Sequence, residues 1–346
     1  MKKIKIGIVG LNFGKSIAEQ QIITGPGSEY FELAAVCDSN TEKCRETAGK
    51  YGVKSYFELD KLTADPEIPV IGLFTGPAGR AELIGRIIKA GKDVMTTKPF
   101  ELDSVKALKV LNEAKSAGRT VHLNSPAPVP DDGLIQIKEW VEKYNLNRPI
   151  ACRCDVWASY REKSDGSWLD DAEKCPAAPI FRLGIYLIND LYGILGEAES
   201  VQLFQSRIFT ERPTSDNAQL GILFKNGAIA NVFASFCIND AQHYSNALIL
   251  NYENGTIYRN VGPIKRGDIA DGDMLSLILP DNKSGNAVIE RKRTSRRTGE
   301  YRWDILYKKL NGEPMEYEIT PEEIVHGIKI TEAIIRAQKS NRTENI

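Results

Sequence analysis

Through the first 124 residues, short apolar runs alternate with amphipathic segments of helical length, and this alternation leaves few folds open to the chain. It is typical of a parallel β-sheet whose strands are joined by crossover helices. We therefore predict a doubly wound α/β domain. The expected strands are Ile4–Val9, Leu33–Cys37, Val70–Phe74, Asp93–Met95 and Thr120–Leu123. Two expected helices, at 81–90 and 104–117, carry their apolar faces on Leu83, Ile84, Ile87 and Ile88, and on Val105, Leu108, Leu111 and Ala114.

After Asn124 the pattern changes to period two, which is typical of half-buried antiparallel strands. Pro126, Pro128 and Pro130 form a rigid connection between the two patterns, so we expect one domain at 1–124 and another at 125–346. The second domain is expected to be an open, mostly antiparallel sheet with helices on one face. Its expected strands are 150–158, 200–209, 218–224, 228–238 and 244–250, its expected helices are 132–143, 179–195 and 321–339, and its expected hairpin turns are Asn226-Gly227 and Asn254-Gly255.

Charge and composition exclude several classes of function. Lys and Arg number 45 against 46 Asp and Glu, so no general basic field favours nucleic acid or an anionic membrane. The cations at 291–293, 296 and 297 are expected to form a solvated hairpin, because Glu290 and Glu300 bracket them. No apolar run approaches the ~20 residues of a membrane span.

Six cysteines without a C-x-x-C pair, and only three histidines, give no metal site. Cys152 and Cys154 are expected to be buried apolar side chains on one strand face, and reduced thiols together with the short apolar run at the start of the chain point to the cytoplasm. His122, His243 and His326 are expected to be structural.

The turn after the first strand resembles a dinucleotide-binding loop in an altered form. Gly10 fits the sharp turn from strand to helix, and a helix N-terminus after Phe13 can bind a pyrophosphate. Asn12 stands where a second glycine is expected, and it is the residue other than glycine that best tolerates left-handed backbone. The third glycine is expected at Lys15, and Gly14 lies one residue early.

Asp38 ends the second expected strand at the spacing of an acid that binds the hydroxyls of an adenosine ribose. A carboxylate there disfavours a 2′-phosphate, so NAD is predicted over NADP. The alternative is that Asp38, with Ser39 and Asn40, merely caps the following helix.

Several further motifs follow in order along the chain: Thr75-Gly76-Pro77, the run from Ala90 to Val94, Thr97-Lys98-Pro99-Phe100, and the run from Arg182 to Asp190. With the Gly10 loop and Cys37-Asp38 they resemble the Gfo/Idh/MocA oxidoreductases over nearly the whole chain. The resemblance implies a Rossmann domain that holds a nicotinamide cofactor. The implied cofactor-binding residues are Gly10, Asn12, Phe13, Gly14, Asp38, Ser39, Thr75, Gly76, Pro77, Arg80, Thr97, Lys98 and Pro99. Two of these positions depart from the family, which usually has Glu at 97 and often a His near position 80.

Lys98 is the first residue to which the resemblance assigns catalysis, because the family's lysine lies beside the nicotinamide and the reacting hydroxyl. The residues alone show a cation just past a strand's carboxyl end, where doubly wound folds bind ligands. Pro99 leaves open a cis peptide that would aim Lys98.

The family often shows Asp-x-Gly-x-His with a further Asp three residues later, and here Arg182, Tyr186 and Asn189 occupy those polar positions. The resemblance implies that Tyr186 handles the hydroxyl proton, with Lys98 and Arg182 lowering its pKa. Packing at the edge of an apolar helix is the alternative for Tyr186. Arg182 either binds a substrate carboxylate or phosphate, which Arg80 and Arg161 would assist in a cationic pocket, or marks the loss of hydride chemistry.

Trp157, Tyr160 and Trp168 lie where the family builds its sugar-facing wall, so with Lys98, Arg182, Tyr186 and Asn189 they form the expected substrate site. Asp155, Asp170 and Asp171 can accept hydrogen bonds from substrate hydroxyls. Each aromatic residue has packing in the core or on the surface as its alternative.

The expected activity is NAD(P)-dependent hydride transfer to or from a sugar, a cyclic polyol or a related hydroxy compound, acidic ones included. One alternative is a lyase or glycosidase that oxidises and re-reduces its substrate through bound NAD, and another is a non-catalytic dinucleotide-binding sensor. Apolar residues on both faces of the second sheet, such as Ala230 and Val232 against Ile229 and Phe233, predict a homodimer or homotetramer.

Overall fold

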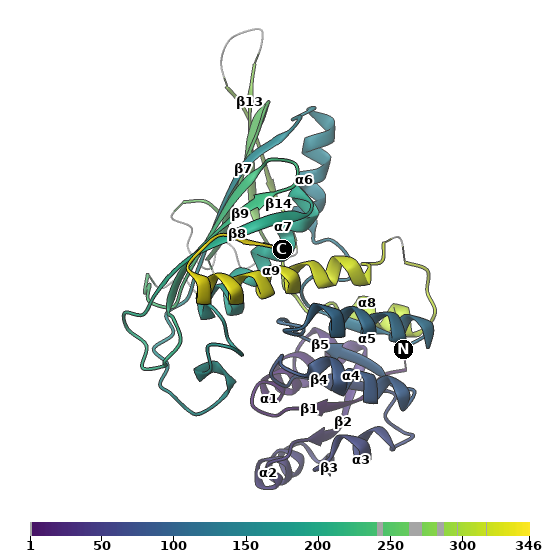
Figure 1. Cartoon of the computed structure of the whole chain (residues 1–346). Coiled ribbons are helices and arrows are strands. Elements are labelled where there is room, and N and C mark those ends of the chain that lie inside the picture. Colours follow the sequence, from purple (N-terminus) through teal and green to yellow (C-terminus); the bar gives the residue numbers. More distant parts are fainter. Residues whose placement is uncertain (1, 241–244, 263–271, 282–286, 296, 316) are drawn as a thin grey trace. The chain divides into compact units, whose positions relative to one another are not determined.

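The computed structural model describes residues 2–240, 245–262, 272–281, 287–295, 297–315 and 317–346 (Figure 1). It divides into two compact units. The first comprises Met1–Val129 and Glu300–Val325, and the second comprises Pro130–Gly299 and His326–Ile346. The division differs from the expected boundary after residue 124, because the chain leaves the first unit at 129 and the segment 300–325 returns to it.

The described part of the first unit contains a six-stranded parallel sheet with the order β3-β2-β1-β4-β5-β6. This order reverses direction between β1 and β4, as in a Rossmann fold, so the predicted α/β architecture is confirmed. The sequence did not predict β3 or the short helix α3. The strands are β1 (Ile4–Val9), β2 (Phe31–Cys37), β3 (Lys54–Tyr56), β4 (Val70–Leu73), β5 (Asp93–Thr96) and β6 (Val121–Leu123).

The helices of this unit follow the predicted pattern with one error. Helix α4 buries Ile84, Ile87 and Ile88 as expected. In α5, Leu111 and Ala114 are buried as expected, together with Ala107 and Val110, but Val105 is 75% exposed. The helices are α1 (Gly14–Ile17), which continues as the π-helix η1 (Ala18–Ile23), η2 (Pro26–Glu29), α2 (Thr41–Tyr51), α3 (Leu59–Thr63), α4 (Arg80–Lys89), α5 (Ser104–Ser116) and α8 (Trp303–Leu310).

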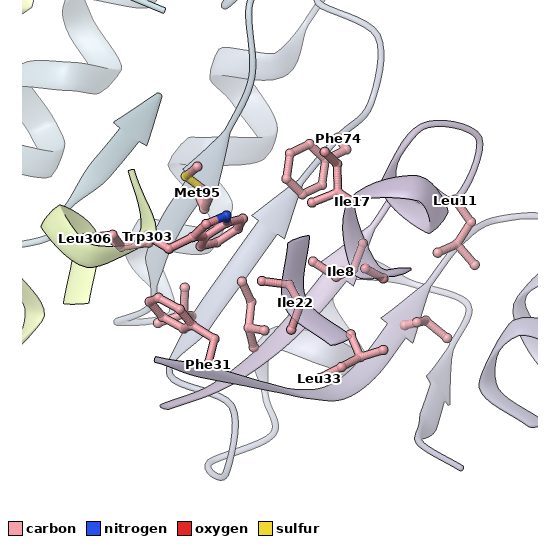
Figure 2. Packing of buried hydrophobic residues seen from close by; sticks show 14 of the residues in the cluster. Ile8, Leu11, Ile17, Ile22, Phe31, Leu33, Phe74, Met95, Trp303 and Leu306 are labelled. Atoms are coloured by element: carbon pink, nitrogen blue, oxygen red, sulfur yellow. The ribbon is translucent and has the colours of Figure 1, made fainter. Parts of the chain in front are cut away.

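Helix α8 explains why segment 300–325 belongs to the first unit. Trp303 is 1% exposed, and its ring centroid lies 5.4 Å from that of Phe31 in an edge-on contact. Figure 2 shows Trp303 and Leu306 of α8 in the same cluster as Ile8, Phe31 and Met95 of the sheet. Burial of such large apolar side chains is the dominant stabilising term in a core, so α8 completes the first unit although about 180 residues separate it from β6.

The described residues of the second unit form a sheet of nine strands, ordered β14-β13-β12-β11-β7-β10-β9-β8-β15. Only the β7–β10 pairing among them is parallel, so the prediction of a mostly antiparallel sheet is confirmed. The strands are β7 (Pro149–Trp157), β8 (Ala198–Ser206), β9 (Asn217–Phe224), β10 (Ile229–Ser235), β11 (Ser245–Tyr252), β12 (Gly255–Arg259), β13 (Met274–Pro280), β14 (Ala287–Arg293) and β15 (Glu344–Asn345). The helices are α6 (Asp132–Lys143), η3 (Trp168–Asp170), the π-helix η4 (Ile180–Gly184), α7 (Ile185–Leu195) and α9 (Pro321–Ser340).

One face of this sheet is buried and the other is open. Cys152, Cys154 and Val232 are at most 1% exposed on the buried face, as expected for the two cysteines, whereas Ile229 on the open face is 57% exposed. The second predicted hairpin is shifted by one residue, because Tyr252 pairs with Gly255 and the turn is Glu253-Asn254.

Candidate functional site

A candidate cofactor site in the first unit lies at the carboxyl ends of β1, β4 and β5, where the strand order of the Rossmann sheet reverses. Gly10 has a φ of +86°, and a Cβ at this position would lie 3.0 Å from the backbone of Phe74 and Thr75. Because only glycine combines this conformation with this close approach, the turn after β1 is built around Gly10. Thr75, Gly76 and Pro77 form the loop after β4 beside it.

Gly14 takes the third glycine role that the sequence assigned to Lys15. A Cβ on Gly14 would lie 2.8 Å from Cγ2 of Ile8, so the missing side chain lets the helix approach β1 closely. The loop is therefore one residue shorter than the usual fingerprint. Asn12 is exposed and binds the Lys43 ammonium through its Oδ1. Its φ is not positive, so this turn does not use the left-handed backbone that asparagine tolerates. Phe13 is 47% exposed and contacts Phe74 edge-on.

Asp38 is half-buried at the end of β2 and ties that strand to the Gly10 loop. Its Oδ2 accepts a hydrogen bond from the Leu11 amide at 2.7 Å, and its Oδ1 accepts one from the Asn40 amide at 2.9 Å. Helix α2 is capped by Asn40, whose Oδ1 accepts from the Lys43 amide at 3.0 Å. Asn40, not Asp38, therefore caps α2. Asp38 lies beside the Gly10 loop. Ser39 is exposed next to it.

Arg80 and Glu101 join the loops after β4 and β5. Arg80 is 1% exposed, and its guanidinium donates to the carbonyls of Thr75, Thr97 and Pro99. Burial lowers the pKa of Arg80 to about 10. The Glu101 carboxylate accepts from the amides of Gly79 and Ala81 at the start of α4, at 3.2 and 2.8 Å. Arg80 therefore shapes the two loops from within and does not extend a cation toward a substrate, contrary to the cationic-pocket hypothesis.

Lys98 lies half-buried at the start of this second loop, two residues after β5, and its peptide bond to Pro99 is cis. The Lys98 amide donates to Oδ1 of Asn124 at 3.0 Å, and the Thr97 hydroxyl is 3.1 Å from the same oxygen. The hydroxyl of Tyr301 is 2.9 Å from that of Thr97. Asn124 directly follows β6 and Tyr301 comes from the returning segment, so only the fold shows that both support Lys98.

In the second unit, Tyr186 occupies the first turn of α7, directly after the π-helix η4. It is half-buried, and its ring lies against Gly299, where a Cβ would overlap the ring. Asn189 lies against Gly327 of α9, where a Cβ would overlap its amide oxygen. The two glycines leave room for these side chains. Tyr186 packs against the segment at Gly299, whereas Asn189 packs against helix α9.

Arg182 is held by a carboxylate that the sequence analysis did not identify. Its two terminal nitrogens lie 2.7 and 2.8 Å from the oxygens of Glu162, and its guanidinium faces the rings of Tyr160 and Phe236 at 5.0 and 4.7 Å. Burial opposes the charge of Arg182, but Glu162 outweighs it and raises the Arg182 pKa. Arg182 is therefore a paired cation whose charge is largely neutralised.

Glu162 also accepts from Arg212 at 2.8 Å, and Arg212 in turn binds Asp165 and Asp170 at 2.9 and 2.7 Å. These two cations and three carboxylates carry a formal charge of −1. The network around Arg182 is therefore anionic, contrary to the hypothesis of a cationic pocket. Of the other expected substrate residues, Trp157 donates to Asp240 at 3.0 Å and Trp168 contacts Phe181 edge-on. Arg161 lies over the ring of Phe209 and donates to the Cys237 carbonyl.

A buried charged cluster lies next to α7. Arg259 is fully buried and binds Asp190 at 2.9 Å, and Asp190 also accepts from Thr298 at 2.8 Å. Asp131 caps α6 through the Leu134 amide, and burial, followed by the charge of Asp190, raises the Asp131 pKa to about 7.

Two of the three histidines are buried in structural positions. Burial lowers the pKa of His122 to about 3 and that of His326 to about 4, and Nε2 of His326 accepts from the Ala198 amide. His243 and Arg296 lie outside the described residues. The helices in the described ranges include none with the length and apolar character needed to cross a membrane.

Comparison with known proteins identifies the family. Residues 4–125 match the oxidoreductase family with an NAD-binding Rossmann fold, and residues 134–258 match the GFO/IDH/MocA C-terminal domain. The chain belongs to the Gfo/Idh/MocA oxidoreductase family. Among individual relatives, the dehydrogenase aclE of Aspergillus oryzae is 26% identical over 60% of this chain and 59% of its own length. The chain thus matches less than two thirds of that relative.

The 1,5-anhydro-D-fructose reductase of Ensifer adhaerens is 22% identical over 67% of this chain and 70% of its own length. The crystal structure of the aldose-aldose oxidoreductase from Caulobacter crescentus aligns with a TM-score of 0.74 at 19% identity, covering all of both chains. The Gfo/Idh/MocA fold therefore extends over the whole chain, and Thr97 and Arg182 are departures within a shared fold.

Proposed function

We propose that this Gfo/Idh/MocA protein is an NAD-dependent oxidoreductase acting on a sugar, a cyclic polyol or a related hydroxy compound. The observation that carries the proposal is the edge formed by β1, β4 and β5. There a glycine turn without room for a Cβ and a lysine held by backbone and side-chain bonds follow strands of one sheet. The 1,5-anhydro-D-fructose reductase among the relatives supports a carbohydrate substrate.

The glycine turn fits a dinucleotide. Gly10 and Gly14 leave the space that side chains would fill, so the backbone after β1 can approach a pyrophosphate. Asp38 would accept hydrogen bonds from the hydroxyls of the adenosine ribose, and its charge would repel a 2′-phosphate, which favours NAD over NADP. Ser39, Thr75, Gly76 and Pro77 would complete the cofactor-binding residues.

When bound, the nicotinamide accepts or supplies the hydride of the carbinol carbon. Lys98 would place its positive charge beside the substrate hydroxyl and stabilise the negative charge that develops on the oxygen. Tyr186 would hold or accept the hydroxyl proton through its phenol oxygen. Because Glu162 already binds the two terminal nitrogens of Arg182, the charge of Arg182 is paired, and the site would suit a neutral substrate.

The experiment compares the wild-type chain with Lys98→Met, which removes the charge and keeps a similar length. Formation of NADH is followed at 340 nm with a panel of aldoses, inositols and sugar acids. We expect Lys98→Met to lower kcat about 100-fold or more, the usual range for loss of a positioned acid–base or electrostatic group, with the Kd for NADH within threefold of wild type. Equal kcat in both proteins on an active substrate would reject the role of Lys98.

The same panel distinguishes the two alternatives. NAD that copurifies tightly and is regenerated in each turnover, so that product accumulates without net formation of NADH, indicates a lyase or glycosidase. Cofactor binding without product from any compound indicates a sensor, an outcome that the departures at Asn12, Thr97 and Arg182 would then explain.

We also propose that two or four copies associate through the open face of the nine-stranded sheet. Phe204, Leu223 and Ile229 expose 36–66% of their surface on the adjacent strands β8, β9 and β10 of this face, with Phe233 half-buried beside them. Ile289 on β14 is 52% exposed farther along the same face. Neighbouring apolar residues on an exposed sheet face are typical of a protein interface. A monomer in light scattering at micromolar concentration would contradict this proposal. A cytoplasmic location is proposed on the six free thiols.

A further inference from the structure

The residue before Lys98 is a buried threonine where the family usually has glutamate. Thr97 is 6% exposed, and its hydroxyl lies between two polar groups: the Tyr301 hydroxyl at 2.9 Å and Oδ1 of Asn124 at 3.1 Å. The same Asn124 oxygen is 3.0 Å from the Lys98 amide nitrogen. Four residues from the ends of β5 and β6 and from the returning segment before α8 therefore share one short chain of hydrogen bonds.

The direction of this chain follows from its members. The Lys98 amide is a donor, so the Asn124 atom that it faces must be the carbonyl oxygen, which can only accept. Thr97 has a single hydroxyl proton and donates it to that oxygen. Tyr301 must therefore donate to Thr97, and burial keeps Tyr301 protonated by raising its pKa. The order is Tyr301 to Thr97 to Asn124, with the Lys98 amide as the second donor to Asn124.

The Tyr301 ring is itself fixed by aromatic packing. It stacks on Trp303, with ring centroids 5.9 Å apart and an angle of 19° between the planes, and it meets Phe74 edge-on at 6.2 Å. Phe74 meets Phe13 of the nucleotide loop at 6.1 Å. Figure 2 shows Phe74 and Trp303 within the core cluster of the first unit. Tyr301 thus connects the Lys98 loop, the nucleotide loop and the core through rigid groups.

We propose that Tyr301 is a positioning residue for Lys98, acting through Thr97 and Asn124. The proposal rests on the proposed function of Lys98. Tyr301, Thr97 and Asn124 are all neutral, so they position the loop before Lys98 without placing a negative charge next to it. It also explains why the segment 300–325 returns to the first unit: it delivers the hydroxyl that orders the loop before Lys98.

Three substitutions separate positioning from mere packing. Thr97→Val keeps the shape but leaves the buried Tyr301 donor without its acceptor, so it should disturb the chain most. Tyr301→Phe keeps the ring packing and leaves Thr97 bonded to Asn124, so its effect should be smaller. Thr97→Ser keeps the hydroxyl and should restore most of the wild-type behaviour.

The test measures the reactivity of the Lys98 amine on NAD-loaded protein by limiting acetic anhydride and mass spectrometry, with exposed Lys115 as the internal reference. We expect Thr97→Val to raise Lys98 acetylation at least threefold relative to Lys115, Tyr301→Phe to raise it about twofold, and Thr97→Ser to return it toward wild type. On an active substrate, Thr97→Val should lower kcat about tenfold with the Kd for NADH within twofold.

Unchanged Lys98 acetylation in a folded Thr97→Val protein would overturn the proposal. If Thr97→Val does not fold, Tyr301→Phe decides, and unchanged acetylation in that variant overturns the proposal in the same way. The labelling needs no substrate, so wild-type protein that turns over no compound would count against the proposed function and leave the positioning result standing.

Discussion

Replacing Glu162 by glutamine should convert Arg182 from a neutralised cation into an anion-binding group. Two hydrogen bonds join Glu162 to Arg182 at 2.7 and 2.8 Å, and a third joins it to Arg212 at 2.8 Å. Glutamine has a similar size, but it is neutral and offers one acceptor oxygen instead of two. The variant therefore raises the formal charge of the network by one and loosens the hold on the Arg182 guanidinium.

Two magnitudes follow from this geometry. Hydrogen bonds to charged groups contribute about 1.5–3 kcal/mol, and because the pair is partly exposed we expect a loss of about 2 kcal/mol. For a unit of this size that loss lowers Tm by about 4–8 °C. A ligand carboxylate about 4 Å from the released cation would gain up to about 4 kcal/mol at an effective dielectric constant near 20, and even a third of this gain gives tenfold in affinity.

The assay is calorimetric titration of NAD-loaded protein with D-glucose and D-glucuronate, which differ by the carboxylate. We expect the affinity for glucuronate relative to glucose to rise at least tenfold in Glu162→Gln. Asp165→Asn is the matched control, because it removes one negative charge from the same network but binds Arg212 at 2.9 Å and leaves the Arg182 pair intact. An unchanged ratio in Glu162→Gln, or an equal rise in Asp165→Asn, would refute the reasoning.

Three further predictions concern the cofactor loop, the core and pH. Gly10→Ala should weaken NADH binding at least tenfold in a fluorescence titration, whereas Gly52→Ala, which also has positive φ but no atom within 4 Å of its Cβ, should leave it unchanged; equal effects would show that strain alone matters. Trp303→Ala should lower the free energy of unfolding by about 3–5 kcal/mol in a denaturant titration. A loss below about 1 kcal/mol would show that segment 300–325 is not part of the first core. Because the Asp131 pKa rises on folding to about 7, the free energy of unfolding should fall as pH increases from 4 to 7. Asp131→Asn, which can still cap α6, should show a shallower fall in Tm over this range. Parallel Tm curves for the two proteins would contradict the raised pKa of Asp131.

The parts of the fold that the sequence predicts are those with a local apolar signature. The strands β1, β4 and β5 are short apolar runs buried in the sheet interior, and their predicted ends differ from the observed ones by at most one residue. Strand β3 could not be predicted, because its three residues, Lys54–Tyr56, are largely exposed and carry no apolar pattern. They join the sheet through backbone pairing with β2. An amphipathic helix such as α8 shows that one face is buried but not which core it covers.

The candidate site shows the same limit at the level of side chains. Gly10 and Asp38 could be predicted because their roles follow from position along a strand–turn–helix unit. Arg80 and Arg182 were recognisable as unusual cations, but their charge alone suggested a ligand. Their actual partners are backbone carbonyls in one case and a carboxylate 20 residues away in the other, and such pairings depend on tertiary structure.

Three departures from the family pattern bear on whether the site has decayed. Asn12 binds Lys43, Arg182 binds Glu162, and Thr97 lies between Tyr301 and Asn124. Random loss of function removes partners and leaves buried polar groups unsatisfied, which is costly. Here Thr97 and Arg182, which are buried and half-buried, have complementary partners, and the exposed Asn12 also binds Lys43. Such matched pairs are the pattern expected when a site is retained and its chemistry adjusted, so the departures favour an oxidoreductase with an altered substrate preference over a sensor that has lost its reaction.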